Sequence, residues 1–413
     1  MTSSTPPTAL PGSHYPGPGG EPFAGQNGPY APPGHQHAPQ PHPGQQAPQP
    51  HPAQYAPAQH APQHGQHGAG QHGTGQHAPV PAGPGGKLEE LHAITQRIAA
   101  NVERVLVGKP EVVRIALVAL LAEGHLLVED VPGVGKTSLA KALARSIDCS
   151  VSRIQFTPDL LPSDVTGVSI FNRQTNEFEF RPGPVFANIV VGDEINRASP
   201  KTQSALLECM EEHQVTVDGN TYELHSPFMV IATQNPIEME GTYALPEAQR
   251  DRFTARVSIG YPDPQAELAM VDEHAGHDVF ATLRPVSDAD QVRAMIETVR
   301  AVQITQEVRR YAVEVVSATR RLSEIRIGAS PRSTLHLVRA ARAQAALSGR
   351  EYVVPDDIHS VAIPVLAHRL VLTPEAQASR RSPAELVRGL IQRVPVPQAT
   401  PEGGAQWSTA RGR

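Results

Sequence analysis

The middle of the sequence contains five short apolar runs, separated for the most part by stretches with helical periodicity. The runs are His125–Glu129, Arg153–Phe156, Asn188–Val191, Phe228–Thr233 and Arg256–Ile259. Strands that are buried on both faces give such short apolar runs, whereas half-buried strands alternate between apolar and polar residues. Buried strands that alternate with helices predict an α/β fold, in which helices cover both faces of a five-stranded parallel sheet.

Helical patterns precede the first of these runs. An apolar stripe predicts a first helix that ends before Gly108-Lys109-Pro110, and a more buried helix is expected over Glu111–Glu123. The residues of the stripe are Leu88, Leu91, Thr95, Ile98, Val102 and Val105.

Strand patterns stop after Tyr261-Pro262-Asp263-Pro264, and helical patterns take over. Helices are expected over residues 308–319 and over Ser333–Leu347. A third should begin at Asp356 or Asp357, because either carboxylate could cap it. Residues 262–394 are therefore expected to form a small all-helical domain.

The beginning of the chain differs in composition from the rest. Residues 1–86 hold 20 of the 41 prolines, 16 of the 33 glycines and 10 of the 19 histidines, and their single charged residue is Glu21. Such a segment cannot bury enough apolar surface to offset the entropy of ordering it. We therefore expect a disordered tail over residues 1–86, whose histidines are solvated or bind metal adventitiously. An α/β domain over 87–261, the helical domain and a flexible end over 395–413 would follow.

Composition and charge exclude several classes of protein. The formal net charge of −6 argues against a strongly cationic nucleic-acid binder. The two cysteines, Cys149 and Cys209, have no disulfide or zinc spacing. The N-terminus lacks a signal-peptide pattern, and the longest apolar stretch, Ile115–Ala122, is far shorter than the ~20 residues of a membrane span. We therefore expect a cytoplasmic protein without a membrane span.

The strongest chemical signal comes directly after the first apolar run. Gly133-Val134-Gly135-Lys136-Thr137-Ser138 lies between that predicted strand and a helical pattern, which is the setting of a phosphate-binding loop. Glycines let the backbone direct N–H groups at phosphate oxygens, Lys136 can reach the β and γ phosphates, and Thr137 can bind Mg²⁺. One residue departs from the general pattern, because Asp130 stands where a further glycine is expected.

A second signal is a pair of carboxylates, Asp193 and Glu194, at the end of the third apolar run. At the tip of a strand, Asp193 would hold Mg²⁺ through water, and Glu194 would orient and polarise an attacking water. An Asp-Glu pair of this kind is weak by itself, since many are solvated turn residues. Its position downstream of the Lys136 loop favours the catalytic interpretation.

Several longer stretches resemble the MoxR family of AAA+ ATPases, and together they span roughly residues 88–397. The stretches are Val131–Thr137, Gly183–Asn188, Asp193–Ala198, Pro200–Glu212 and Ala232–Pro236. The family shares the aspartate that breaks the general loop pattern. The resemblance implies a P-loop NTPase domain followed by a helical lid, with ATP and Mg²⁺ as ligands.

The same resemblance implies roles for three further residues. Asn235 matches the sensor-1 residue, which would share the attacking water with Glu194. Arg252 lies in a stretch that carries the arginine finger, the residue that a neighbouring subunit supplies, and Arg250 is the alternative. Arg332 opens a helix and matches sensor 2, which would reach back to the nucleotide and couple the lid to its γ-phosphate.

Two hairpins are predicted within the α/β domain. One pairs Val168–Phe171 with Glu177–Arg181, and the other joins Gln214–Val217 to Thr221–Leu224 through Asp218-Gly219-Asn220. The resemblance implies that both face the central pore of a ring and move with the nucleotide state. From the pattern alone they could equally be ordinary surface hairpins.

The implied function is Mg²⁺-dependent ATP hydrolysis by a ring, most simply a hexamer, which remodels client proteins in a chaperone-like role. Proteins with a von Willebrand factor A domain are the partners that the resemblance suggests. One alternative is a nucleic-acid motor, but residues 87–261 carry 16 bases and 23 acids, and residues 262–413 carry 19 and 17, so no basic stripe emerges. Another is a non-hydrolysing nucleotide switch or scaffold, against which Glu194 and Asn235 argue.

Overall fold

The computed structural model describes residues 84–131, 133–235, 242–262, 264–265, 267–268 and 279–397. These residues all belong to one unit of the chain, Gln76–Arg413. The predicted tail up to residue 83 and the chain end from residue 398 lie outside the described residues. Within the described ranges, no helix is both long enough and apolar enough to cross a membrane.

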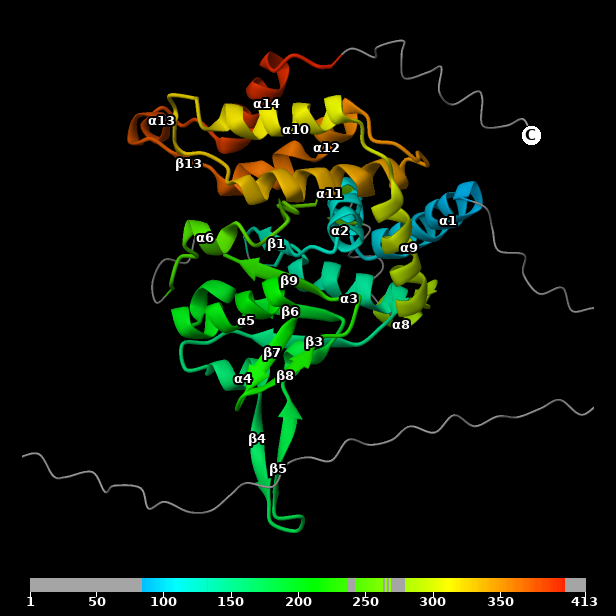
Figure 1. The fold of residues 1–413 in the computed structure, drawn as a ribbon, viewed down its shortest axis with the longest axis vertical. Helices are drawn as coiled ribbons and strands as arrows, with labels where there is room; N and C mark the ends of the chain where they lie inside the picture. Colours follow the sequence, from blue (N-terminus) through cyan, green and yellow to red (C-terminus); the bar gives the residue numbers. More distant parts are fainter. Residues whose placement is uncertain are drawn as a thin grey trace, which may run out of the picture. The chain divides into compact units, whose positions relative to one another are not determined.

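A five-stranded parallel sheet forms the centre of the fold, as the apolar runs predict (Figure 1). Its order is β10-β1-β9-β6-β3. The strands are β1 (Leu126–Glu129), β3 (Val151–Gln155), β6 (Ile189–Asp193), β9 (Met229–Gln234) and β10 (Ala255–Val257). Because β1 and β6 both pair with β9, the carboxyl ends of these three strands meet at one edge of the sheet.

Alternate residues of the three central strands, β1, β6 and β9, enter two different cores. Leu126 and Val128 of β1 lie in the core that also contains residues of α1 (Pro84–Glu103), α2 (Pro110–Leu121) and α3 (Lys136–Ser146). Leu127 packs on the opposite face, in the core that contains residues of α5 (Pro200–Glu212). The two faces are therefore both apolar, which explains why the strands appear in the sequence as continuous apolar runs.

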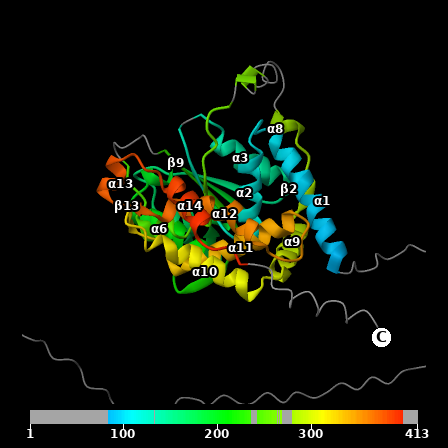
Figure 2. The same ribbon diagram turned by 90° about the horizontal axis from the view of Figure 1, so that it is seen from above.

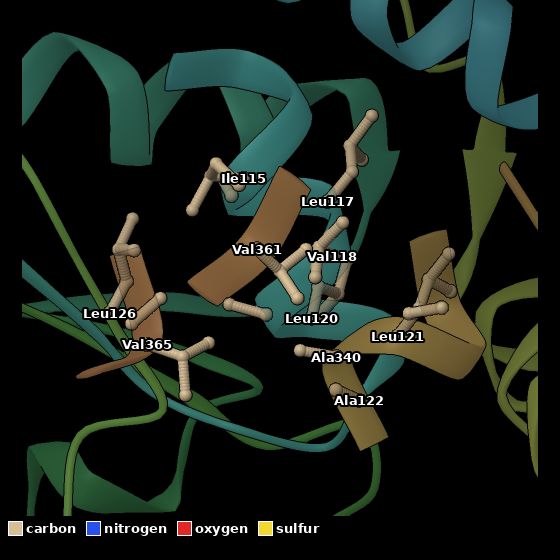
Figure 3. Close-up of a cluster of buried hydrophobic side chains, with 14 of the residues drawn as sticks. Ile115, Leu117, Val118, Leu120, Leu121, Ala122, Leu126, Ala340, Val361 and Val365 are labelled. Carbon is tan, nitrogen blue, oxygen red and sulfur yellow. The ribbon is translucent and has the colours of Figure 1, made fainter. Parts of the chain in front are cut away.

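Helix α2 lies between the sheet and the helices of the C-terminal region. Figure 3 shows Val118 and Leu121 of α2 among Ala340 of α11 (Pro331–Leu347) and Val361 of α12 (Pro355–Leu366). The side chains from Val112 to Leu121 are buried, apart from Arg114. Figure 2 shows α1 alongside α9 (Ala289–Ala301). Helix α1 contacts both α9 and α3.

The predicted helical lid is confirmed in the C-terminal region. Besides α9, α11 and α12, the described part contains α8 (Val279–Thr282), α10 (Gln306–Thr319), η3 (Ala367–Arg369), α13 (Pro374–Ala378) and α14 (Pro383–Arg393). Short strands accompany these helices. They are β12 (Ile325–Ile327), which pairs with β13 (Val371–Leu372), and β11 (Ser287–Asp288), which pairs with β2 (Ile147–Asp148).

The start of α12 differs from the prediction, because neither Asp356 nor Asp357 caps it. The helix begins at Pro355, whose fixed φ and missing N–H suit the first helical position. Asp357 therefore lies in the first turn, where its carboxylate accepts a hydrogen bond from the Val354 N–H (2.8 Å) and pairs with Arg350 (2.5 Å). The aspartate still accepts a hydrogen bond from a backbone N–H at the start of the helix, although it lies within the helix.

Both predicted hairpins are confirmed. The first consists of β4 (Gly167–Asn172) and β5 (Glu177–Pro182), and it projects away from the sheet (Figure 1). The second consists of β7 (Gln214–Val217) and β8 (Asn220–Glu223). The rings of Phe180 and Tyr222 stack at 4.0 Å and join the two hairpins. The shorter elements α4 (Pro162–Thr166), η1 (Pro184–Phe186), η2 (Ile195–Arg197) and α6 (Glu247–Arg250) connect these parts.

Two phenylalanines provide a matched test of these packing assignments. Phe156, directly after β3, is 0% exposed, whereas Phe178 on the projecting hairpin is 74% exposed. We expect Phe156→Ala to lower the free energy of unfolding by about 3–5 kcal/mol, because it leaves a cavity. Phe178→Ala should change it by less than about 0.5 kcal/mol. Urea unfolding followed by circular dichroism measures both values, and equal effects would contradict the assignment.

Candidate active site

The loop between β1 and α3 has the backbone of a phosphate-binding loop. Gly133 and Gly135 adopt positive φ angles of 84° and 93°, a region that favours glycine, and Gly135 is the N-cap of α3. The first N–H groups of a helix have no partners within the helix and lie at the positive end of its dipole. Val134, Lys136, Thr137 and Ser138 are all partly exposed here, so an anion can reach this turn.

Lys136 extends its amine back over the loop. Its Nζ donates hydrogen bonds to the carbonyl oxygens of Asp130 (2.6 Å) and Gln234 (3.2 Å). The ammonium group therefore lies where the ends of β1 and β9 meet, beside the glycine turn. In this position the charge of Lys136 can neutralise a phosphate that the loop holds.

Asp130 replaces the usual glycine for a structural reason. One of its carboxylate oxygens accepts hydrogen bonds from the Ser258 hydroxyl (2.8 Å) and the Gly260 N–H (2.6 Å), and the other accepts one from the Val131 N–H (2.8 Å). Burial alone would raise the pKa of this carboxyl, but these hydrogen bonds outweigh it and lower the pKa. Asp130 thus ties the start of the loop to the segment after β10.

Thr137 and Asp193, which the sequence analysis assigns to Mg²⁺, face each other. The Thr137 hydroxyl lies 3.1 and 3.2 Å from the two carboxylate oxygens of Asp193, at the end of β6. Hard cations prefer oxygen ligands, and Mg²⁺ bound with a nucleotide takes few of them from the protein. The pair therefore fits Mg²⁺, and no larger cluster of His, Cys, Asp and Glu competes for a metal within the described ranges.

Glu194 is held in an unusual backbone conformation beside this pair. Its φ of 58° places a residue with a side chain in the left-handed region, a form of strain that concentrates at functional sites. The Glu194 N–H donates to the Thr233 hydroxyl (2.9 Å), which itself donates to Asp193 (3.3 Å). The end of β9 thus holds the backbone of Glu194 and the carboxylate of Asp193.

Two residues of β3, Arg153 and Gln155, complete this edge of the sheet, and sequence reasoning missed both. Arg153 pairs with Asp193 at 2.6 Å, and the Gln155 amide donates to Glu194 at 3.1 Å. Glu194 also pairs with Arg197 at 2.9 Å. Two polar residues at alternate positions of a strand were the available signal, but only the pairing of β3 with β6 reveals their partners.

Asn235, the predicted sensor-1 residue, directly follows β9 at the same edge. It is 3% exposed, and its backbone carbonyl oxygen accepts a hydrogen bond from the side-chain amide of Asn196 (3.4 Å). The structure therefore brings Lys136, Thr137, Asp193, Glu194 and Asn235 together around the glycine turn.

Arg252 and Arg332 lie elsewhere, and they lie together. Both guanidinium groups pair with the carboxylate of Glu211, Arg252 at 3.2 Å. Nearby, the Thr254 N–H donates to the His125 carbonyl oxygen (2.9 Å), which places this cluster at the amino ends of the strands. A strand of the length of β1 spans about 13 Å. Arg332 therefore lies away from the phosphate loop of its own chain. The sequence analysis, by contrast, expects it to reach the nucleotide at that loop.

Arg250, the alternative to Arg252, lies two residues earlier and is the last residue of α6. Its Nε atom is buried and has no hydrogen-bond partner among the described residues. The exposed fractions of the Arg252 and Arg332 side chains are 31% and 39%. Both arginines on Glu211 therefore have surface that can contact another molecule.

The role of Asp130 predicts a pH-dependent loss of stability. Asp130→Asn should lower the free energy of unfolding by about 1–3 kcal/mol at neutral pH, since the buried donors lose their charged acceptor. The folded-state pKa of Asp130 is lowered, so its contribution is present above 3.8, the ordinary value, and is lost as the pH falls through the folded value. The difference from wild type in urea unfolding should therefore narrow in acid. Asp148→Asn, at an exposed position, is the control, and an equal loss in both variants would contradict the anchoring role.

Two family profiles match the chain at this site and beyond it. The profile of the ATPase family associated with various cellular activities (AAA) covers residues 125–255, and the AAA lid domain covers residues 317–390. Among solved structures, a candidate ATPase from Cytophaga hutchinsonii superposes with a TM-score of 0.70. It is 38% identical, and the match covers 76% of this chain and 98% of that chain.

Three relatives match over most of their own lengths. Uncharacterized protein YeaC of Bacillus subtilis is 50% identical over 309 residues, which are 75% of this chain and 97% of YeaC. Chaperone MoxR1 of Mycobacterium tuberculosis is 42% identical over 335 residues, which are 78% of this chain and 88% of MoxR1. Protein MoxR of Paracoccus denitrificans is 32% identical, with 76% and 99% covered. With the phosphate loop, the paired carboxylates and the lid all present, the chain belongs to the MoxR family of AAA+ ATPases.

Proposed function

We propose that this protein hydrolyses ATP in a Mg²⁺-dependent reaction and that it works as a ring, most simply a hexamer. The observation that carries the proposal is the gathering of Lys136, Thr137, Asp193, Glu194 and Asn235 at the carboxyl edge of the sheet. Each supplies one requirement of phosphoryl transfer to water, namely charge neutralisation, metal binding or the positioning of the nucleophile.

In this mechanism the loop and Lys136 hold the β and γ phosphates. Thr137 and Asp193 hold Mg²⁺, which neutralises charge on the phosphate oxygens when it is bound. Glu194 orients the attacking water and accepts its proton, while the amide of Asn235 holds the same water by a hydrogen bond. Gln155 and Arg197 donate hydrogen bonds to the Glu194 carboxylate and set its direction before the water binds.

Arg252 and Arg332 serve a neighbouring subunit in this proposal. Both lie at the sheet edge opposite their own phosphate loop, and both are partly exposed on the shared partner Glu211. An arginine that stabilises transition-state charge can come from another subunit. A site that needs such an arginine is complete only when subunits assemble head to tail, and such an assembly closes into a ring when the rotation between subunits divides a full turn.

The ring would remodel client proteins, a role that agrees with the chaperone name of the relative MoxR1. The β4–β5 hairpin, with Phe171 and Phe178 exposed near its tip, would face the pore and contact the client. Partners with a von Willebrand factor A domain and a cytoplasmic location belong to the same proposal. In it, residues 87–261 form the nucleotide-binding domain and residues 262–394 form the lid.

Lys136→Ala should abolish ATP binding, because the phosphate charge then lacks its neutralising amine. Titration with a fluorescent ATP analogue measures the affinity. Lys141→Ala is the matched control, since Lys141 lies on the exposed face of the same helix. Unchanged affinity in the Lys136 variant would sink the assignment of the phosphate loop.

Mixing two inactive variants tests the donation of Arg252 between subunits. Glu194→Gln should bind ATP and hydrolyse it slowly, and Arg252→Ala should do the same for lack of its arginine. Such an arginine contributes on the order of 10³–10⁵ in rate in GTPases. In mixed rings, an Arg252→Ala subunit keeps Glu194 and receives Arg252 from a Glu194→Gln neighbour, so ATPase activity should partly return.

Differently labelled variants establish that the subunits exchange. If they exchange and activity stays at the level of the separate variants, Arg252 does not act between subunits and Arg250 is to be tested next. Arg332→Ala, mixed with Glu194→Gln in the same way, distinguishes an action of Arg332 on the neighbouring nucleotide from an action on its own. Recovery means that Arg332 acts on the neighbour, whereas an arginine that serves its own nucleotide cannot be replaced from the next subunit.

A further inference from the structure

A fully buried arginine of the lid reaches the turn that carries Arg252. Arg369 ends the short helix η3, and its side chain is only 1% exposed. Burying a guanidinium is costly unless it is paired and hydrogen-bonded. Burial lowers the pKa of Arg369 to about 10, although Asp251 raises it, while the charge of Arg332 lowers it further. The group remains charged at neutral pH, so its partners matter.

Those partners stand on either side of Arg252. The guanidinium donates to the carboxylate of Asp251 (2.8 Å) and to the carbonyl oxygen of Phe253 (2.5 Å). Arg252 is the residue between them, so one side chain contacts the carboxylate of the residue before it and the backbone of the residue after it. The planar guanidinium with several donors suits this double contact, and a lysine amine, as a point charge, reproduces it poorly.

Asp251 extends the contact to the start of α11. Its carboxylate also accepts hydrogen bonds from the hydroxyls of Ser330 (2.7 Å) and Ser333 (3.3 Å). Ser330 is the N-cap of α11, and Arg332 lies in the first turn of that helix. Arg252 and Arg332 are thus each flanked by members of one network, and their guanidinium groups share Glu211.

A partly buried pair elsewhere in the lid shows what a purely structural contact looks like. Arg350 donates to both oxygens of Asp357, which is 2% exposed, at 2.7 and 2.5 Å. The hydrogen bonds of that pair brace the start of α12 and reach no residue next to Arg252 or Arg332. The Arg369 network differs because Arg369 donates to Asp251 and Phe253, the two residues next to Arg252, and Asp251 connects them to the start of α11.

We propose that Arg369 and Asp251 form a clamp that positions Arg252 for the neighbouring subunit and couples its position to the lid. The inference rests on the proposed donation of Arg252. Neither clamp residue touches the nucleotide, so both are positioning residues. When the lid moves α11 and η3, the clamp moves the Arg252 turn with them, and the lid of one subunit thereby influences hydrolysis in the next.

The test uses Arg369→Lys in the full-length chain, which keeps the charge but loses the double contact. We expect ATP affinity to stay within about twofold of wild type and the ATPase kcat to fall at least tenfold. Mixing with Glu194→Gln should restore activity, because the Arg369→Lys subunit keeps Glu194 and receives a correctly positioned Arg252. Mixing with Arg252→Ala should restore nothing, since neither subunit then supplies a positioned arginine.

Asp251→Asn is the second variant, in case Arg369→Lys does not fold, and the same pattern of recovery is expected. Arg350→Lys is the control, because it makes the same exchange in an ion pair with a buried aspartate away from Arg252, and its kcat should stay within about twofold of wild type. On an Arg252→Ala background, Arg369→Lys should cause no further loss of kcat. This last comparison tests the clamp without requiring donation between subunits.

Three results would overturn the clamp. The first is a kcat for Arg369→Lys at the wild-type level. The second is a loss of kcat in Arg369→Lys that mixing with Glu194→Gln does not restore, although the mixture of Arg252→Ala with Glu194→Gln does regain activity. The third is a further loss on the Arg252→Ala background. Failure of the proposed function looks different, because the mixture of Arg252→Ala with Glu194→Gln then stays inactive although the subunits exchange.

Discussion

The chemistry of this protein depends on the parallel pairing of β1, β9 and β6. Parallel strands that are neighbours end at the same edge, so the residues that follow them converge although they are far apart in the sequence. Lys136 follows β1, Asp193 ends β6 and Asn235 follows β9. Each strand is buried on both faces, and a shift of its register by one residue would exchange its two apolar faces. The packing of the sheet therefore fixes the relative positions of the catalytic side chains along the direction of the strands.

The same sheet separates two sets of charged groups. The carboxyl edge carries the phosphate loop and the carboxylates, and the amino edge carries Arg252 and Arg332 on Glu211. The length of the strands, about 13 Å for β1, separates the two sets of groups within one chain. The proposed reaction therefore needs a second copy of the chain, and the lid becomes relevant to it through the residues that surround Arg252.

The sequence by itself determined the class of fold and the composition of the carboxyl edge. Apolar runs alternating with helical patterns predict the parallel sheet, since strands that helices cover on both faces are typical of parallel sheets. Gly133 to Ser138 and the Asp193-Glu194 pair are local in the chain, and their chemistry follows from spacing within a few residues. Resemblance to a known family supplied Asn235 and the two arginines.

Only the tertiary structure decided which side chains meet across elements. Arg153 and Gln155 contact the carboxylates because β3 pairs with β6 in a particular register, which no local pattern encodes. Asp130 departs from the general loop pattern because Ser258 and Gly260, more than a hundred residues away, donate to it. Arg332 faces Glu211 rather than its own phosphate loop, since the packing of the lid on the sheet fixes the direction of α11. Such contacts depend on the distances between packed elements, and those distances arise only when the whole core is assembled.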